Sequence, residues 1–362
     1  MKWEKVKLGE LYEVHNGLSK AGKFFGEGYP FLTFSTVFNN YFIPKQITDL
    51  VQSTEKEQES YSIRRGDVFV TRTSETSDEL GMSCVALKDY PMATYNGFTK
   101  RMRPITNRVL PEYIGYYMRL PSFRGEFRAF STMTTRASLR NEDLLGLEVK
   151  LPSIEIQKQI ADILSAYDDL IENNQRQIKL LEEAAQRLYK EWFVDLRFPG
   201  HENTKIVDGV PEGWSRTNIN EILTFHRGYD LTKNEMKAGR YPVVGSTTVI
   251  GYHNEFKIKG PGIVTGRSGS LGKYQFIWDN FWPHNTSLYI SDYKDHNIFF
   301  VYSLLQTVDF ASLNNGGAIP TLNRNVLSNI EVIEPTDELQ EMFAKIAEPQ
   351  YQKIKNLEKQ NN

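Results

Sequence analysis

The sequence predicts an α+β protein made of two β-rich modules, each followed by a long helix. Its 362 residues exceed what one ordinary core needs, so two domains with connecting structure are expected. Both halves contain short runs of Val, Phe, Tyr and Thr separated by Gly, Pro, Asn and Asp, a texture typical of strands and turns. After each half, apolar residues recur at the three- and four-residue steps of a helix.

The first half returns in the second half as a recognisable copy. Trp3, Tyr29-Pro30 and Val68-Phe69-Val70-Thr71-Arg72 correspond to Trp214, Tyr241-Pro242 and Ile263-Val264-Thr265-Gly266-Arg267. Later, Ser138-Leu139-Arg140-Asn141 corresponds to Thr321-Leu322-Asn323-Arg324. We expect the first module at residues 1–152, its helix at 153–196, the second module at 197–334 and the last helix at 335–362. Two similar modules with approximate two-fold symmetry suit a protein that holds two similar things at a fixed separation.

Within the first module, strands are predicted from Pro30 to Val37 and from Asp67 to Thr71, and a helix from Pro111 to Leu120. The net charge of the chain is only −2, but the charges are unevenly placed. Between Lys88 and Arg140 there are ten Lys and Arg residues against three acidic ones. Such a block favours attraction to phosphate, although it can also be an ordinary solvated face.

The helix after the first module is the clearest structural signal in the sequence. Pro152-Ser153 supplies a stop and an N-cap, and a helix from Ser153 to Leu188 would be about 50 Å long at ~1.5 Å per residue. Its apolar stripe needs a partner, and the natural candidate is the pattern after Pro335, running in the opposite direction as a coiled-coil spacer. Pro349 is expected to kink or interrupt that second helix. The alternative is a helix buried against its own module.

The spacer and its contacts with partner helices are expected to use mainly apolar side chains, with the polar Asn174 fixing the register of the seam. The predicted residues are Ile160, Ile163, Tyr167, Leu170, Asn174, Leu181, Leu188, Trp192, Phe193, Phe343, Ile346, Ile354 and Leu357.

Several function classes find no support in the sequence. No run reaches the ~20 apolar residues of a membrane span, and Met1-Lys2-Trp3-Glu4 does not begin a signal peptide, so a cytoplasmic protein is expected. The lone Cys84 has an apolar neighbourhood typical of a core residue, and the six histidines lack metal-ligand spacing. The run from Gly266 to Lys273 departs from the phosphate-binding loop in spacing, and Tyr274 follows where Ser or Thr is needed. We therefore expect neither catalysis nor a metal.

The segments around the first helix carry a specific resemblance. Leu151-Pro152-Ser153-Ile154-Glu155-Ile156-Gln157 opens this helix, and Leu188-Tyr189-Lys190-Glu191-Trp192-Phe193-Val194 closes it. Val210-Pro211-Glu212-Gly213-Trp214 then opens the second module. In this order, and with Gly266-Arg267-Ser268-Gly269-Ser270-Leu271-Gly272-Lys273, the chain resembles the specificity subunit of Type I restriction-modification enzymes. One departure is the last helix, which has no counterpart of the Trp192-Phe193 segment.

The resemblance implies two target-recognition domains that each read one half of a split double-stranded DNA sequence, with the helices setting the spacing. It implies assembly with two adenine-N6 methyltransferase subunits, which bind S-adenosylmethionine, and often with two motor-nuclease subunits. The chain itself contains no Asn-Pro-Pro-Tyr or Asp-Pro-Pro-Tyr run and no glycine-rich S-adenosylmethionine motif, so a non-catalytic role is expected.

DNA reading should then rest on basic, hydroxyl and amide side chains in loops, because Arg suits guanine and Asn suits adenine. The candidates are Arg72, Thr73, Arg101, Arg103, Thr134, Thr135 and Arg136 in the first module, and Arg227, Arg267, Ser268, Lys273, Asn285, Asn323 and Arg324 in the second. For each residue alone, a structural role is an equal alternative. The loop sequences differ between modules, which predicts an asymmetric bipartite target.

The competing hypothesis is a two-module protein-interaction scaffold that does not bind DNA, and salt dependence separates the two. If about six phosphates are contacted, the affinity of the purified chain for duplex DNA should fall on the order of a thousandfold between about 50 and 200 mM salt. Fluorescence anisotropy titrations across this range measure the slope. A scaffold would show no salt-sensitive DNA binding.

Overall fold

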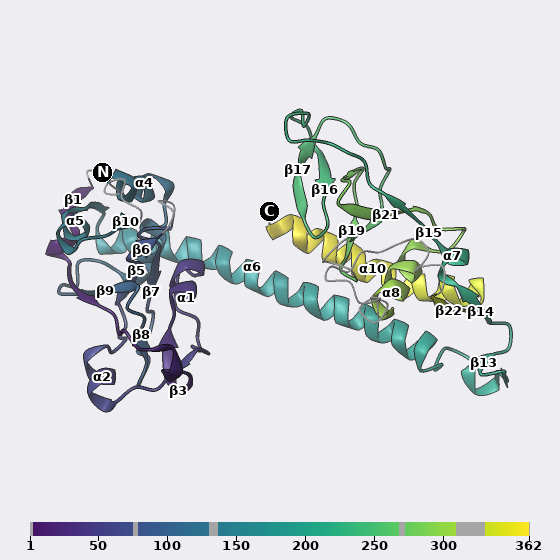
Figure 1. The fold of residues 1–362 in the computed structure, drawn as a ribbon, viewed down its shortest axis with the longest axis horizontal. Coiled ribbons are helices and arrows are strands. Elements are labelled where there is room, and N and C mark those ends of the chain that lie inside the picture. Colours follow the sequence, from purple (N-terminus) through teal and green to yellow (C-terminus); the bar gives the residue numbers. More distant parts are fainter. Residues whose placement is uncertain (1–2, 75–78, 130–136, 268–271, 309–329, 362) are drawn as a thin grey trace. The chain divides into compact units, whose positions relative to one another are not determined.

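The computed structural model describes residues 3–74, 79–129, 137–267, 272–308 and 330–361 (Figure 1). The chain divides into two compact units, Met1–Asp169 and Leu170–Asn362. The longest helix, α6 (Ile154–Tyr189), begins in the first unit and ends in the second. The architecture is α+β in each unit, as the sequence predicts.

The first unit is built around an antiparallel sheet in the order β2-β9-β5-β7, with a second sheet in the order β4-β3-β8. The strands are β2 (Tyr12–Asn16), β9 (Thr99–Pro104), β5 (Val68–Thr71), β7 (Ser83–Val85), β4 (Leu50–Val51), β3 (Phe25–Leu32) and β8 (Thr94–Tyr95). Strand β5 is buried on both faces, because Val68 and Val70 enter one apolar cluster while Phe69 enters another. Two short pairs complete the strands: β1 (Glu4–Lys7) with β11 (Glu148–Leu151), and β6 (Thr73–Ser74) with β10 (Ala137–Ser138).

Short helices connect these strands. They are η1 (Leu8–Glu10), η2 (Gly22–Phe24), α1 (Phe34–Asn39), α2 (Glu55–Ser60), α3 (Pro111–Tyr117), α4 (Pro121–Ala129) and α5 (Asn141–Gly146). The predicted helix from Pro111 is confirmed as α3, and the strand from Asp67 as β5. The predicted strand from Pro30 to Val37 is wrong in its second half. There the Thr33 Oγ1 accepts a hydrogen bond from the Thr36 N–H at 3.3 Å and caps α1 instead.

The second unit has the same topology as the first. Its main sheet has the order β15-β21-β18-β19, and its second sheet has the order β17-β16-β20. The strands are β15 (Thr224–Arg227), β21 (Ser287–Asp292), β18 (Gly262–Gly266), β19 (Tyr274–Ile277), β17 (Val249–His253), β16 (Tyr241–Val244) and β20 (Trp282–Pro283). In both units one pair is parallel, β3 with β8 and β16 with β20. The sequence repeat is therefore a structural repeat.

The remaining elements of the second unit surround this frame. They are η3 (Lys190–Val194), η4 (His201–Asn203), α7 (Ile219–Ile222), α8 (Ile298–Thr307), α10 (Asp337–Asn361), and the strand pairs β12 (Ile206–Val207) with β13 (Val210–Pro211) and β14 (Ser215–Asn218) with β22 (Glu331–Glu334). The pair β14–β22 matches β1–β11 of the first unit.

In the second unit, α10 packs antiparallel against the later part of α6, as predicted. The rings of Tyr189 and Phe343 lie 5.7 Å apart near the end of α6 and the start of α10. At the other end, the Asn174 Nδ2 donates to the Asn361 Oδ1 at 3.0 Å, and Asn174 is buried. The expected interruption at Pro349 is wrong, because α10 continues through this residue. A proline removes one backbone N–H donor, and the neighbouring Ala347 and Tyr351 are buried and hold the helix in place.

The predicted spacer residues have different environments. Ile354 and Leu357 are buried on α10, and Ile160, Leu181 and Leu188 are partly buried in apolar clusters. Trp192 and Phe193 are buried in the core of the second unit, in a π-helical turn that follows α6. The residues with exposed side chains are Ile163, Tyr167, Leu170 and Ile346.

Replacing Phe343 by Ala should destabilise the second unit by about 3–5 kcal/mol, because its fully buried ring leaves a cavity among other aromatic rings. Urea unfolding followed by tryptophan fluorescence measures the change. Ile346→Ala is the matched control on the same helix, since this side chain is 45% exposed. It should change stability by no more than about 0.5 kcal/mol. Equal losses for both variants would contradict the packing described here.

Candidate nucleic-acid interface

Two arginines occupy equivalent positions in the two units. Each directly follows the same inner strand of the main sheet, which we call the central strand: β5 in the first unit and β18 in the second. Arg72 follows β5 and Arg267 follows β18. The backbone N–H of Arg72 donates to the carbonyl of Phe98 at 2.9 Å, and that of Arg267 donates to the carbonyl of Thr286 at 3.2 Å. The strand-to-loop geometry is thus repeated, and it places one arginine beside the turn before β9 and the other beside the turn before β21.

A glycine fixes the close approach of a second loop in both units. A Cβ on Gly17 would lie 2.1 Å from the carbonyl oxygen of Asn96, and a Cβ on Gly228 would lie 2.1 Å from that of His284. Neither position accepts a side chain, so the backbone reaches its neighbour only because the residue is glycine. Three loops therefore meet at the same end of each sheet.

In the first unit, this end of the sheet gathers positive charge. The Lys100 side chain is buried and its Nζ donates to the Asn141 Oδ1. Burial lowers the pKa of the Lys100 ammonium and the charge of Arg72 lowers it further, while the charge of Asp143 raises it. Two interacting cations attract an anion such as phosphate, and Asp143 balances part of their charge. Lys100 was not among the sequence candidates, although it belongs to the basic block.

Phe98 adds an apolar surface to the same corner. It is 61% exposed, and its backbone carbonyl is the acceptor for Arg72. The turn that carries it is held by the Asn96 Oδ1, which accepts from the Phe98 N–H at 2.7 Å. An exposed ring next to a cation suits contact with the methyl groups or faces of bases.

In the second unit, two predicted residues are brought together by a third. The Asn285 Nδ2 donates to the Asp230 Oδ1, and the Arg227 Nη2 lies 3.6 Å from the same oxygen. Asn285 precedes β21 in the turn whose Thr286 carbonyl accepts from Arg267. Sequence reasoning missed Asp230 because its partner Asn285 is 55 residues away.

Arg101 and Arg103 have interior positions instead. Arg101 is 3% exposed, and its Nη1 donates to the Ser62 carbonyl at 2.8 Å. The guanidinium of Arg103 binds both carboxylate oxygens of the buried Asp67, at 2.8 and 2.7 Å. This hydrogen bonding raises the pKa of Arg103. Both guanidinium groups hold β9 to the segment before β5, and the acidic residue directly before an apolar strand was the signal for this pairing.

The other candidates are placed as follows. Thr73 lies in β6, whose backbone pairs with Ser138, and Lys273 is exposed just before β19. Outside the residues that the structure describes lie Thr134, Thr135, Arg136, Ser268, Asn323 and Arg324.

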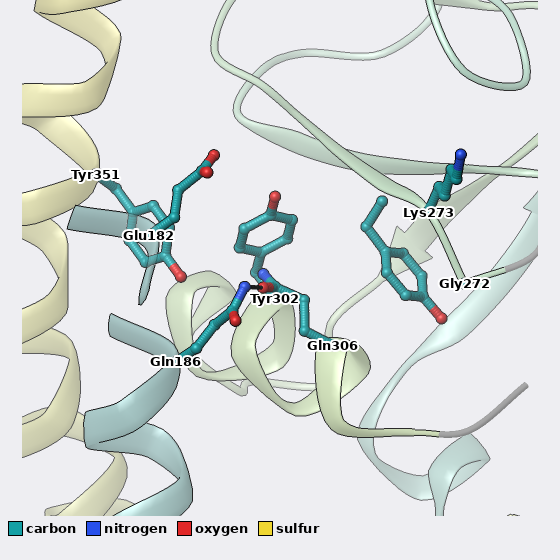
Figure 2. A pocket seen from close by; sticks show the side chains of 8 residues that line it. Glu182, Gln186, Gly272, Lys273, Tyr302, Gln306 and Tyr351 are labelled. Atoms are coloured by element: carbon teal, nitrogen blue, oxygen red, sulfur yellow. Dashed lines mark hydrogen bonds between the residues drawn. The ribbon is translucent and has the colours of Figure 1, made fainter. Parts of the chain in front are cut away.

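Lys273 also lines a pocket of about 370 Å³ in the second unit (Figure 2). Figure 2 shows the carboxylate of Glu182 beside the rings of Tyr302 and Tyr351, and a hydrogen bond between Gln186 and Gln306. Burial of the carboxylate raises the pKa of Glu182, and the charge of Glu183 adds to the rise. Glu358 lines a neighbouring pocket that shares Glu182, Tyr302 and Tyr351, and partial burial together with the charge of Glu182 raises its pKa. The pocket therefore combines one carboxylate with aromatic rings, and Lys273 adds a positive charge to its lining.

The described residues form neither a metal-ligand cluster nor a helix that could span a membrane. No three His, Cys, Asp or Glu side chains there are close enough together to hold a metal ion. None of the described helices combines the length and apolar character of a membrane span.

Comparison with known proteins gives consistent results. The family described as the Type I restriction modification DNA specificity domain matches residues 1–183 and 211–362. The MjaIX specificity subunit, a Type I restriction enzyme subunit of Methanocaldococcus jannaschii, is 25% identical over 391 residues, covering 99% of this chain and 89% of that one. The HindI specificity subunit, a Type I restriction enzyme subunit of Haemophilus influenzae, is 27% identical over 200 residues. This match covers 53% of this chain and 41% of that one.

A solved structure matches the chain at the level of the fold. It is the crystal structure of a Type-I restriction-modification system S subunit from M. genitalium, with a TM-score of 0.62 and 18% identity. The match covers 99% of this chain and 92% of that one. The low identity means that the likeness shows the fold alone.

The raised pKa of Glu182 predicts a pH-dependent stability effect. A carboxyl whose folded-state pKa is raised stabilises the fold fully below its unfolded pKa, and this contribution is lost as the pH rises through the folded value. Glu182→Gln removes the charge, so its melting temperature should exceed that of the wild type on the order of 1–2 °C at pH 8, and the difference should vanish near pH 4. Differential scanning fluorimetry at both pH values tests this.

Glu172→Gln is the control, because Glu172 is an exposed carboxylate on the same helix and is paired with Arg176. Its loss should leave the melting temperature at pH 8 unchanged or slightly lower. A lower melting temperature for Glu182→Gln at pH 8 would show that the Glu182 carboxylate stabilises the second unit instead.

Proposed function

We propose, from the premise that this chain belongs to the Type I restriction-modification DNA specificity family, that it reads a bipartite DNA target with one half-site for each unit. The observation that carries the proposal is the repeated loop corner, which is the end of the main sheet in each unit where three loops meet. Each unit presents an arginine after its central strand, next to a turn fixed by a glycine contact. Two equal frames in one chain suit two half-sites in one target.

At each loop corner, one kind of contact would supply affinity for DNA and another would supply sequence specificity. Lysine and arginine contacts with phosphates supply affinity without sequence information, and side chains that reach base edges supply specificity. Arg72, Arg227 and Arg267 have the two-pronged donors that suit guanine, and Asn285 has the amide that suits adenine. Arg101 and Arg103 support the sheet from inside, so we remove them from the set expected to touch DNA.

The two half-sites should differ in sequence. The residues after the equivalent strands are Arg72-Thr73-Ser74 in one unit and Arg267-Ser268-Gly269 in the other. Asp230 and Asn285 also add a polar pair to the second unit. Since base choice depends on such side chains, a shared frame with different loops favours an asymmetric target.

Catalysis would come from other subunits. We infer assembly with two adenine-N6 methyltransferase subunits, which bind S-adenosylmethionine, and with motor-nuclease subunits in complexes that also cut DNA. The exposed Ile163, Tyr167 and Leu170 of α6 support such an assembly, because apolar side chains grouped on one helix are typical of contact surfaces. The family match disfavours the alternative of a protein scaffold without a DNA role.

Arg72→Ala should weaken binding to the cognate site by about 1–3 kcal/mol if Arg72 reads a guanine, and preference should be lost at one position of one half-site. Arg65→Ala is the matched control, because Arg65 precedes β5 and Arg72 follows it. Both variants lose one positive charge from the same unit. Affinity selection from randomised duplexes measures the preference at each position.

Methylated adenines mapped in DNA from cells with and without the chain would identify the target. The expected result is methylation at a bipartite sequence that disappears without the chain. If Arg72→Ala and Arg65→Ala lowered the affinity for every DNA sequence equally, Arg72 would contribute only its positive charge and would not read a base.

A further inference from the structure

Resting on the proposed function, we propose that Arg227, Asp230 and Asn285 form a base-reading triad in the second unit. Arg227 and Asn285 would touch base edges, and Asp230 would act as the positioning residue that orients both. The half-site read by this unit would then contain a guanine and an adenine, the bases that these two side chains pair with best.

The triad is formed by two loops of the described chain. Arg227 ends β15, and Asp230 follows three residues later, so one carboxylate oxygen lies 3.6 Å from the Arg227 Nη2. Asn285 comes from the turn between β20 and β21, and its Nδ2 donates to that same oxygen. One carboxylate thus links two side chains that are distant in sequence.

Both readers keep their recognition groups available. A guanidinium has five N–H donors, and the contact with Asp230 uses one side of it. The Asn285 amide gives one N–H to Asp230, which leaves its second N–H and its carbonyl for the N7 and N6 positions of adenine. The Arg227 side chain is 50% exposed and Asn285 is partly exposed, so both can reach a ligand.

The ion pair of Arg227 and Asp230 contributes little to the stability of the fold. Its position beside Asn285 matters more for recognition. An exposed ion pair contributes about 0–1 kcal/mol to folding, so the arrangement is not explained by a need for stability. The ion pair does orient Arg227 for binding. A long arginine side chain loses less conformational freedom on binding when it is already held in place. The carboxylate also repels phosphate, which disfavours the unspecific use of Arg227 as a backbone contact.

The turn that carries Asn285 is held from three sides. The His284 Nε2 lies 3.2 Å from the Leu231 carbonyl, next to Asp230. The Thr286 carbonyl accepts from the Arg267 N–H at 3.2 Å and from the Ser246 Oγ at 2.7 Å. A support of this kind gives the readers a fixed geometry, which base discrimination requires.

The first unit has no such triad at the corresponding positions. The Leu18 N–H donates to the Tyr95 carbonyl, as the Tyr229 N–H donates to the Pro283 carbonyl, and this aligns the two corners. Asn16, Ser19 and Gly97 then correspond to Arg227, Asp230 and Asn285. The triad therefore distinguishes one half-site from the other.

Selection from duplexes with one randomised half-site tests the triad, using the full chain and its variants. Arg227→Ala and Asn285→Ala should each relax the preference at one position, by on the order of tenfold, in the half-site of the second unit only. Asp230→Ala should relax both positions together, while binding to unrelated DNA stays equal or becomes tighter because a negative charge is lost. Asp230→Asn keeps an oxygen acceptor for Asn285, so it should relax only the arginine position.

Arg216→Ala is the control, because Arg216 forms an exposed ion pair with Glu331 in the same unit and carries the same charge as Arg227. It should leave both positions unchanged. Unchanged preferences for Asp230→Ala, or an equal loss of affinity for all sequences with an unaltered melting temperature, would overturn the triad. If the wild-type chain selected no sequence at all, the proposed function would fail first, and the two failures are therefore separable.

Discussion

The packing of Phe193 against rings from three other parts of the chain is the contact on which the second unit depends. Phe193 lies 5.5 Å from Phe343 of α10, 5.4 Å from Phe300 of α8 and 5.8 Å from Trp214, measured between ring centroids. It follows α6 in a π-helical turn, where an extra residue per turn redirects the side chains. The end of the long helix, the last helix and the strand-rich module therefore share one aromatic core. Burial of such rings supplies most of the energy that holds the pieces together.

A second constraint is the shared strand order of the two units. Because β5 and β18 have equivalent neighbours in their sheets, the arginine after each strand has the same backbone surroundings in each unit. The frame is supported by apolar residues, which tolerate change as long as volume and pattern are kept. The loops at its end are free of that requirement. This separation explains how one architecture can carry two different recognition surfaces.

The sequence predicted the repeat, the long helix and its antiparallel partner because these depend on local periodicity and on matching segments. Single side chains were harder. Arg101 and Arg103 resembled DNA ligands in a basic block, yet the buried Asp67 and the Ser62 carbonyl, more than 30 residues away along the chain, fix them inside. Thr33 ended a predicted strand by capping α1, and Asp230 gained its role only through Asn285. Long-range pairing of polar groups leaves no periodic trace, so composition and spacing do not reveal it.

The tight corner of the first unit has an evolutionary consequence. A Cβ on Gly97 would lie 2.4 Å from the Ser19 Oγ, so a side chain cannot be added at Gly97 while Ser19 keeps its place. The two positions correspond to Asn285 and Asp230 of the second unit. A larger residue at Gly97 therefore depends on position 19, because the Ser19 hydroxyl must first rotate away or be replaced by a smaller group. Diversification of this corner is therefore order-dependent, since a change at position 19 opens the space that a side chain at position 97 would fill.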